Sequence, residues 1–514
     1  MNFKDFKSHI EDYCNENLPT NLELKPSSKI IHDTTWGTNL YRPHEVSIIN
    51  TQLFQRLRHV SQMGFANYVY PSARHSRFEH SLGVAILVEK MCKHINSDKV
   101  IITGNDLFSL RLAGLLHDIG HCLFSHTSEL VYGHILDSYI TEALGDDAPK
   151  VAPHEFLSYL IVTSQSFKKY FDQLKKRDSL SSKIDIEEIA LMIVGMVKDE
   201  NRRYLTSFIN GPFDADKIDY FQRDSHFSGL PAQIDLDRLF YEIQISNTNT
   251  EDVVVRDLTI GITGVMSIEQ IMFNKMYLYS SIYNHHKIEA LDCMFKGIFE
   301  YISESKTNVT IFGREFDFEN PISFLKFSEF DFYALANLEN DTVLRRMVQN
   351  ILNRKLLKRA VVINKSTVSV TNGEFLDLFL STGVNRQQKS IRLREIAKQI
   401  HQNAGVSCSP HEIWIDLPKA PNLEEGSSTY VRINKNSDTE IVPIDKFFPI
   451  AQFQDLYNNN KRSFYVFCPE ECLKEVAAAT QNYFQKEHNL VFNNKAFPYG
   501  LPVSIKPNTP CQHD

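Results

Sequence analysis

Apolar residues recur with helical spacing along most of the first 300 positions. Over residues 43–58, for example, Val46, Ile49, Leu53 and Leu57 fall on one side of a helix. Few runs in this part alternate cleanly between apolar and polar residues, and KIIHD at 29–33 is the main extended segment. The pattern therefore predicts a mostly α protein, with a short helix within 1–28 and further helices over 76–95, 106–118, 154–171, 185–198, 235–244 and 265–304.

The pattern changes after residue 304. TNVTIFGREFDF and AVVINKSTVSV predict strands, and LENDTVLRRMVQNILNRKLLKRA predicts a helix with a basic end. From about residue 410, HEIWIDLP, TYVRINK and SFYVFCP predict strands, and ECLKEVAAATQNYFQKEH predicts a helix. We therefore predict five parts: an N-terminal helix and linker (1–28), a helical domain (29–304), a connecting region (305–400), a smaller α+β region (401–492) and a loose tail (493–514).

Composition narrows the choice of partners and compartment. The 514 residues carry 63 acidic and 55 basic side chains, a net charge of -8, which disfavours non-specific adhesion to nucleic acid without excluding a locally basic pocket. The first residues lack the apolar core of a signal peptide, and no apolar run approaches the length of a membrane span. The 8 cysteines have scattered spacings, typical of reduced thiols. We expect a cytoplasmic protein with no membrane partner.

The chemistry concentrates in LLHDIGHCLFSHTSE, residues 115–129. An apolar helical run ends in His117 and Asp118, and imidazole with carboxylate suits a divalent metal ion. His121 falls on the same helix face as His117, so we expect it near the metal without having to bind it. His80 lies in a second helical pattern and Asp216 in a third segment. Together they form the pattern H…HD…D, which predicts a metal site built from three distant parts of the chain.

Several strings around these residues resemble one known family. FQRLRHVSQMG, ARHSRFEHSLGV, LLHDIGHCLFSH and DADKIDYFQRD are similar to the dNTP triphosphohydrolases of the HD superfamily, with the strongest match over residues 29–300. The resemblance implies an HD-domain helical core and the hydrolysis of a dNTP to deoxynucleoside and inorganic triphosphate. It also implies a divalent cofactor (Fe, Mn, Zn, Co or Ni, with Mg on the phosphates) and four metal ligands, namely His80, His117, Asp118 and Asp216.

The same resemblance implies a set of catalytic and substrate-binding residues. His121, His126 and His154 match the catalytic histidines, and Glu129 stands where many relatives have an Asp that orients a histidine. The phosphate contacts correspond to Arg77, Lys217, Tyr220 and Lys275, and the deoxyribose contacts to Gln62, Asp224 and Tyr283. Met63 and Tyr279 complete the expected substrate pocket. Without the family resemblance, the simplest interpretation is that Arg77 and Lys217 form local salt bridges. The tyrosine-rich run MYLYSSIY would then be the core-facing part of a helix.

Relatives regulated by nucleotides imply a second site and an oligomer. Lys29, Asp33, Asn50 and Arg58 match residues near the allosteric site of such enzymes, which form dimers to hexamers. Asn50 stands where a vertebrate relative has an Asp that recognises guanine, and an amide offers only one acceptor where a carboxylate offers two. We therefore expect that an activator, where one binds, need not carry guanine. The alternative is that Asn50 only terminates a helical turn.

The metal site by itself leaves other functions open, because one fold serves many substrates. The chain could be an HD-type nuclease or a nucleotide phosphatase acting on another phosphoester, or a nucleotide-sensing module without turnover. Gln62, Arg77 and Tyr283 favour a closed nucleotide pocket over a groove for a strand. All four metal ligands are present, which favours an enzyme over a sensor. Control of dNTP pools, including antiviral defence, is an expectation from the family alone.

Overall fold

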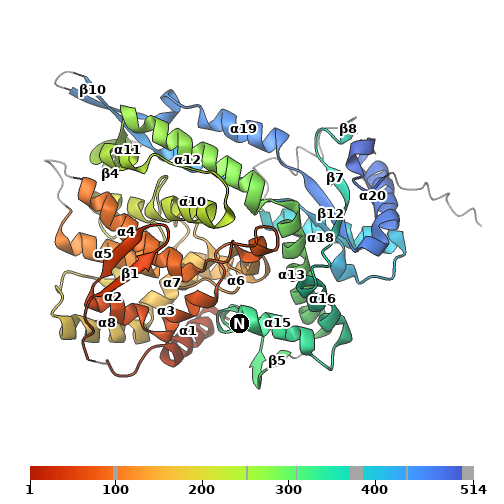
Figure 1. Ribbon diagram of the computed structural model, residues 1–514, viewed down its shortest axis with the longest axis horizontal. Coiled ribbons are helices and arrows are strands. Elements are labelled where there is room, and N and C mark those ends of the chain that lie inside the picture. The colour runs from red at the N-terminus through yellow and green to blue at the C-terminus, as the bar shows by residue number, and fades with distance from the viewer. Residues whose placement is uncertain are drawn as a thin grey trace, which may run out of the picture. The chain divides into compact units, whose positions relative to one another are not determined.

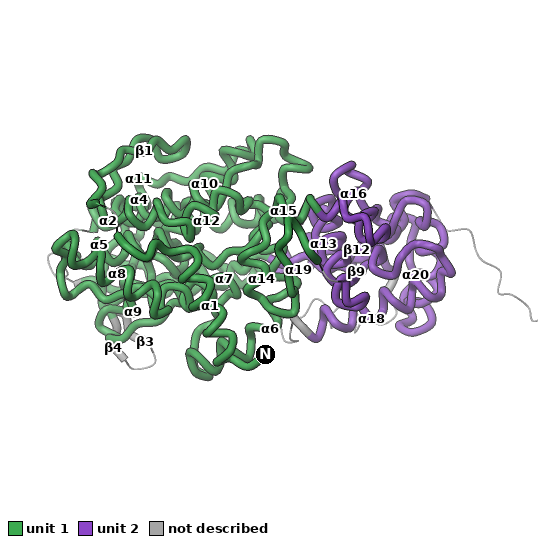
Figure 2. The backbone as a smooth tube through the Cα atoms, turned by 90° about the horizontal axis from the view of Figure 1, so that it is seen from below, with its two compact units in different colours: residues 1–283, 308–334, 421–454 green, residues 284–307, 335–420, 455–514 purple. Residues whose placement is uncertain are grey.

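A computed structural model describes residues 1–22, 24–95, 102–250, 253–307, 309–370, 386–435 and 438–500. The described chain is mostly helical with several small sheets, which confirms the predicted fold class (Figure 1). It forms two compact units that interleave along the sequence (Figure 2). Unit 1 comprises residues 1–283, 308–334 and 421–454, and unit 2 comprises 284–307, 335–420 and 455–514. No helix within the described ranges is long and apolar enough to cross a lipid bilayer.

Unit 1 contains all the residues for which the sequence predicts chemistry. Its helices are α1 (Phe3–Asn17), α2 (Pro43–Ile49), α3 (Gln52–Gln55), α4 (Arg77–His94), α5 (Gly104–Leu116), α6 (His126–Leu144), α7 (Pro153–Thr163), α8 (Gln165–Asp178), α9 (Ile186–Ile193), α10 (Ala215–Ser228), α11 (Leu236–Glu242), α12 (Val265–Leu278), α14 (Pro321–Lys326) and α15 (Glu329–Ala334).

Helix α4 is the central element of unit 1, and most of its side chains are buried. It packs against α5 on one side and α10 on the other (Figure 1). Two glycines make these approaches close. A Cβ atom at Gly114 of α5 would lie 3.1 Å from the backbone nitrogen of Ala85, and one at Gly83 of α4 would lie 2.0 Å from an Asp219 carboxylate oxygen. Both helices therefore reach α4 at the level of His80.

Two sheets lie in unit 1 beside the helices, with a short hairpin of β5 (Val309–Ile311) and β6 (Arg314–Phe316). Strands β1 (Lys29–Asp33) and β2 (Gly37–Tyr41) pair antiparallel. The larger sheet has the order β11 (Asp438–Pro443), β10 (Tyr430–Lys435), β4 (Val253–Gly261), β3 (Ile243–Thr250). Because β10 runs parallel to β4, with Tyr430 opposite Thr259, the segment 421–454 joins unit 1.

Local capping breaks several helices that the periodicity predicted as continuous. The helix predicted over 43–58 is interrupted after Ile49, because Thr51 turns its hydroxyl to the Phe54 amide and starts α3. Ser164 does the same at Phe167 and splits the helix predicted over 154–171. The β3–β4 hairpin was missed, since its polar residues, such as Asn247 and Thr248, hide the alternation.

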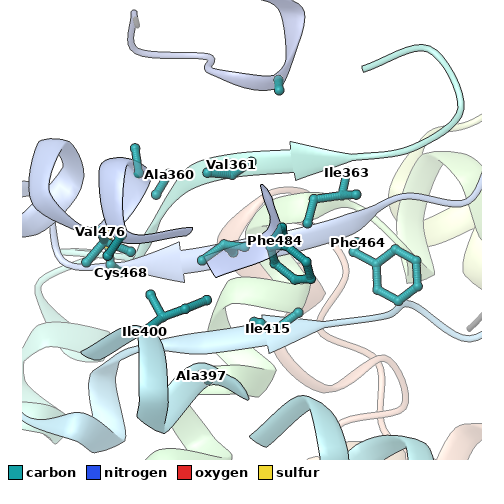
Figure 3. Packing of buried hydrophobic residues seen from close by; sticks show 14 of the residues in the cluster. Ala360, Val361, Ile363, Ala397, Ile400, Ile415, Phe464, Cys468, Val476 and Phe484 are labelled. Atoms are coloured by element: carbon teal, nitrogen blue, oxygen red, sulfur yellow. The ribbon is translucent and has the colours of Figure 1, made fainter. Parts of the chain in front are cut away.

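Unit 2 is built on the antiparallel sheet β7 (Lys358–Ile363), β12 (Phe464–Cys468), β9 (Trp414–Asp416). Its helices are α13 (His286–Ser305), α16 (Thr342–Leu352), α18 (Arg386–Ala404) and α20 (Leu473–His488), and α19 (Ile450–Asn460) runs into it from unit 1. Figure 3 shows Val361, Phe464 and Ile415 on the three strands, with Ile400 of α18 and Phe484 of α20 packed on the sheet. Strands β8 (Val368–Val370) and β13 (Leu490–Phe492) form a second pair.

Two further predictions for this part differ from the structure. The helix predicted over 338–360 ends at Leu352, because the chain turns at Arg354, with φ of 54°, and its last residues enter the buried strand β7. At the start of the predicted tail, Ala496 and Phe497 are buried in the core of unit 2, while residues 501–514 lie outside the described residues.

Candidate metal and catalytic site

Three segments bring the four predicted metal ligands together. His80 comes from α4, His117 and Asp118 follow the end of α5, and Asp216 lies in the first turn of α10. The Nε2 atoms of the two histidines are 3.3 Å apart, and an Asp216 oxygen lies 2.9 Å from that of His80 and 3.6 Å from that of His117. Asp118 oxygens lie 3.5 Å and 3.3 Å from the same two nitrogens. Donor atoms of His80, His117 and Asp118 thus share one small volume, and Asp216 adjoins both imidazole rings.

The partners of both imidazole rings fit a metal ion at this point. The Nδ1–H group of His80 donates to the Asp219 carboxylate over 2.7 Å, and that of His117 donates to the Gly114 carbonyl over 2.8 Å. These bonds leave Nε2 of each ring as the nitrogen that faces the cluster. A carbonyl or carboxylate behind a histidine is the usual support of a metal ligand, and His with Asp suits several divalent metals. His80, His117 and Asp118 also meet the distance requirement for a common ion.

The charges around the cluster agree with a site for a cation. Burial would lower the pKa of His80, but the Asp216 and Asp219 carboxylates outweigh it and raise that pKa to about 10. Burial opposes ionisation of Asp118, yet the Arg77 guanidinium and the two histidines hold its pKa well below the usual range. Arg77 donates to Asp118 over 2.7 Å and to the Ser125 hydroxyl over 2.8 Å.

Replacing Asp219 by asparagine should weaken metal binding. Asp219 is fully buried and accepts bonds from His80, from Arg223 over 2.8 and 2.9 Å and from the Trp36 indole over 2.5 Å. An amide has one acceptor oxygen for these donors, so the His80 ring loses its fixed orientation. We expect metal affinity to fall about 10- to 100-fold. A titration of the metal against a chelator measures it, with the exposed Asp172→Asn as the control; equal affinities would remove this role from Asp219.

A second cluster next to the metal ligands contains the predicted catalytic residues. Glu129 of α6 accepts from Nδ1 of His154 over 2.6 Å and from Nδ1 of His126 over 3.0 Å. The longer Glu side chain therefore makes the contacts expected of an Asp. Burial opposes its ionisation, but the two histidines hold the pKa of Glu129 well below its usual range. In return, Glu129 overcomes the effect of burial and raises the pKa of His154.

His121 connects the two clusters. Its Nε2 atom lies 3.4 Å from an Asp118 oxygen, and its ring stacks on that of His154 with 3.8 Å between centroids. Residues 117–120 form a turn, so His121 does not continue the helix of His117 as we predicted. Within the described chain both ring nitrogens are buried and lack a hydrogen bond. Burial first, then the cations Arg77 and His154, hold the pKa of His121 well below its usual value. Such an unsatisfied group suits a substrate or water partner.

The predicted phosphate contacts pair with acidic and carbonyl groups of unit 1. Lys217 of α10 pairs with Asp214 over 2.8 Å, and Lys275 of α12 donates to the Asn422 carbonyl over 2.6 Å. Both are also near Glu425. Burial and then Tyr279, Asp216 and Glu425 hold the pKa of Tyr220 well above its usual value, so its hydroxyl stays a donor. Arg77 and Lys217 thus do form local salt bridges, beside the metal cluster.

The predicted sugar contacts form a chain of polar groups. Asp224 accepts from the Tyr283 hydroxyl over 2.5 Å and from His75 over 2.8 Å. The His75 carbonyl accepts a hydrogen bond from the backbone N–H of Gln62. The side-chain Oε1 atom of Gln62 is buried without a hydrogen-bond partner in the described chain. Tyr279 contacts Tyr283 edge to face, while Met63 is half-buried beside Gln62. Sequence reasoning missed His75, although it lies five residues before His80.

The four residues predicted for an allosteric site line one pocket. Lys29, Asp33, Asn50 and Arg58 surround a cavity of about 450 Å³ that Phe78 and Phe227 help to close. Asn50 also ends α2, as the alternative interpretation expects, and its role in binding an activator stays a prediction. Asp33 accepts from Arg223 over 2.8 Å, and Arg223 holds Asp219 behind His80. Buried charges therefore run without a break from this pocket to the metal cluster.

Comparison with known proteins gives two family matches and several relatives. Residues 77–222 match the HD domain, and residues 234–491 match the HD associated region. An uncharacterized protein of Methanocaldococcus jannaschii is 26% identical over 87% of this chain and 81% of its own length.

Two relatives carry the name deoxynucleoside triphosphate triphosphohydrolase. The SAMHD1 homolog of Dictyostelium discoideum is 27% identical over 66% of this chain, and human SAMHD1 is 27% identical over 53% of it. The match spans 61% and 44% of these two proteins, which is less than two thirds of each. The HD match covers the segments that carry His80, His117, Asp118 and Asp216, and the second match covers half of the chain. The chain belongs to the HD-domain family of hydrolases and carries the HD associated region.

Proposed function

We propose that this protein is a metal-dependent dNTP triphosphohydrolase, which cleaves a dNTP to deoxynucleoside and inorganic triphosphate. The observation that carries the proposal is that unit 1 contains three sets of side chains suited to this reaction. These are the cluster of His80, His117, Asp118 and Asp216, the histidines held by Glu129, and the Asp224–Tyr283 pair. This reaction needs a metal ion, groups that transfer protons and a binding site for the sugar, and we call the Asp224–Tyr283 pair the sugar clamp.

The residues of the chain have distinct tasks in this reaction. A divalent ion held by the four ligands would supply an activated water at neutral pH and offset charge on the α-phosphate. His121 lies against Asp118 and has two ring nitrogens able to move a proton. Glu129 fixes Nδ1–H of His154 and His126, which leaves Nε2 of each ring for proton exchange. Arg77, Lys217 and Lys275 offset the remaining negative charge of the triphosphate.

Deoxyribose selection would follow from the rigidity of the sugar clamp. The Tyr283 hydroxyl is fixed on Asp224, and Asp224 is fixed on His75. Asp224 can accept a bond from a 3′-hydroxyl, with Gln62 Oε1 as a second acceptor. A ring held in this way against the sugar leaves no space for a 2′-hydroxyl. The pocket would therefore discriminate between dNTPs and NTPs by steric exclusion.

Incubation of the purified protein with each of the four dNTPs tests the proposal. With a divalent metal present, we expect release of inorganic triphosphate and deoxynucleoside, and little turnover of the matching NTPs. Single-stranded DNA and a mononucleotide serve as competing substrates in the same buffer. Cleavage of DNA, or release of single phosphates, would instead identify a nuclease or a nucleotide phosphatase.

We further propose that the pocket between Asp33 and Arg58 binds an activating nucleotide. Lys29 and Arg58 offer cations for phosphates, and the Arg223–Asp219 pair links Asp33 to His80. Asn50 lacks the second acceptor that a guanine edge requires, so activation should not depend on guanine. Hydrolysis of each dNTP, measured with and without a second nucleotide as a candidate activator, tests this expectation. A strict need for dGTP or GTP would contradict it.

A further inference from the structure

The carboxylate of Glu425, in the HD associated region, contacts two lysines that we assign to phosphate binding. Glu425 is 150 positions from Lys275 in the sequence, yet its Oε2 atom is 3.0 Å from the Lys275 ammonium. The same oxygen is 3.9 Å from the Lys217 ammonium. Lys217 directly follows the ligand Asp216 on α10. A single side chain therefore bridges Lys275 and Lys217, the lysine next to a proposed metal ligand.

Each lysine has another partner that holds it in place without Glu425. Lys275 donates to the Asn422 backbone carbonyl over 2.6 Å, and Lys217 donates to the buried Asp214 carboxylate over 2.8 Å. The side chains of Lys275 and Lys217 are 7% and 16% exposed, whereas that of Glu425 is 41% exposed. Among these three side chains that of Glu425 is the most exposed. It is therefore the partner best able to move away from the lysines.

The backbone that carries Glu425 is fixed, so the carboxylate leaves the lysines by a side-chain rotation, which also breaks its 2.9 Å bond from the Asn422 side-chain amide. On one side Leu423 is buried, and its amide donates to Gln454 over 2.8 Å. On the other side Gly426 packs against Met272 of α12 so closely that a Cβ atom would lie 2.2 Å from the methionine methyl. The segment therefore keeps its place while the carboxylate moves.

We propose that Glu425 competes with a bound polyphosphate for Lys217 and Lys275. This inference rests on the proposed function, since it concerns the phosphate side of the same pocket. A carboxylate and a phosphate oxygen make the same charge-assisted bonds with ammonium groups. With no ligand, Glu425 neutralises two closely spaced cations, and a triphosphate with more charge displaces it. Glu425 thereby sets the affinity threshold for anions with several phosphates.

Binding of inorganic tripolyphosphate to the full-length protein tests the inference by calorimetry in excess Mg²⁺. For Glu425→Gln we expect affinity to rise about three- to tenfold over wild type, because the competing charge is gone. Glu424→Gln is the matched control: it makes the same change one residue away, at an exposed side chain, and should stay within about twofold. Lys275→Met should weaken binding in both backgrounds, which locates the ligand. Thermal melting of each variant confirms folding.

Two results would overturn the inference. One is that Glu425→Gln binds tripolyphosphate no more tightly than Glu424→Gln, as expected if Glu425 only supports Lys275. The other is that binding does not depend on Lys275 or is absent altogether. Tighter binding by Glu425→Gln in a protein that hydrolyses none of the four dNTPs would support the inference and reject only the proposed function.

Discussion

His117→Ala is expected to abolish metal binding at the HD site and to reduce hydrolysis by about a thousandfold or more. His117 contributes one of two imidazole nitrogens to the cluster, and its ring is fixed by the Gly114 carbonyl. Alanine leaves one histidine and two carboxylates, a set that binds borderline divalent metals much more weakly. A bound metal supplies several kcal/mol of transition-state stabilisation, and each 1.36 kcal/mol is a factor of ten in rate.

Metal content by elemental analysis and triphosphate release are measured on the same preparation. His134→Ala is the control, since His134 is an exposed histidine of α6 away from both clusters. It should keep full metal content and activity. A His117→Ala protein with one tightly bound metal and wild-type turnover would show that the reaction does not depend on this cluster.

The four proposed metal ligands could be singled out because short strings around them resemble one family. His117 and Asp118 are adjacent, His80 lies in a string with a helical pattern, and Asp216 lies in the string DADKIDYFQRD. The residues that hold them could not be predicted in the same way. Asp219 and Arg223 lie in the same string as Asp216, but their role depends on the close approach of Gly83, which only the packing of α4 on α10 reveals.

Contacts between residues far apart in the sequence could not be predicted from the spacing of apolar residues. Glu329 of α15 accepts from the Ser61 amide over 2.7 Å and from the Phe124 amide over 3.2 Å, and so fixes the turn before His126. Glu425 reaches Lys275 only because β10 pairs with β4. Nothing in the periodicity of either segment indicates these partners. The helix breaks at Thr51 and Ser164 had a local signal, a capping residue, that the apolar period outweighed.

Arg111→Met is expected to lower the free energy of unfolding by about 3–5 kcal/mol, the largest effect we predict on stability. Arg111 of α5 and Glu45 of α2 are both fully buried. The guanidinium binds the carboxylate through two bonds of 2.6 and 2.8 Å and reaches Glu89 over 2.5 Å. Methionine fills the volume but leaves the buried Glu45 charge with weaker partners, the Arg42 amide at 2.7 Å, the Arg42 guanidinium at 3.5 Å and the His44 ring at 4.0 Å. A buried charge that loses its main partner costs more than the pair itself contributes.

The loss of stability in Arg111→Met should become smaller at low pH. Burial opposes ionisation of Glu45, but its bonds with Arg111 outweigh burial and lower its pKa below the ordinary 4.5. A carboxyl group with a lowered folded pKa stabilises the protein above its unfolded pKa, and this stabilisation is lost as the pH falls through the folded pKa. The difference between wild type and Arg111→Met should thus be larger at pH 7 and shrink as the pH falls towards the lowered pKa of Glu45 in the wild-type protein. Urea unfolding at several pH values measures it, with the exposed Arg203→Met expected within about 0.5 kcal/mol of wild type. A difference that stays constant down to pH 3 would mean that the lost packing of Arg111, and not its charge, determines the effect.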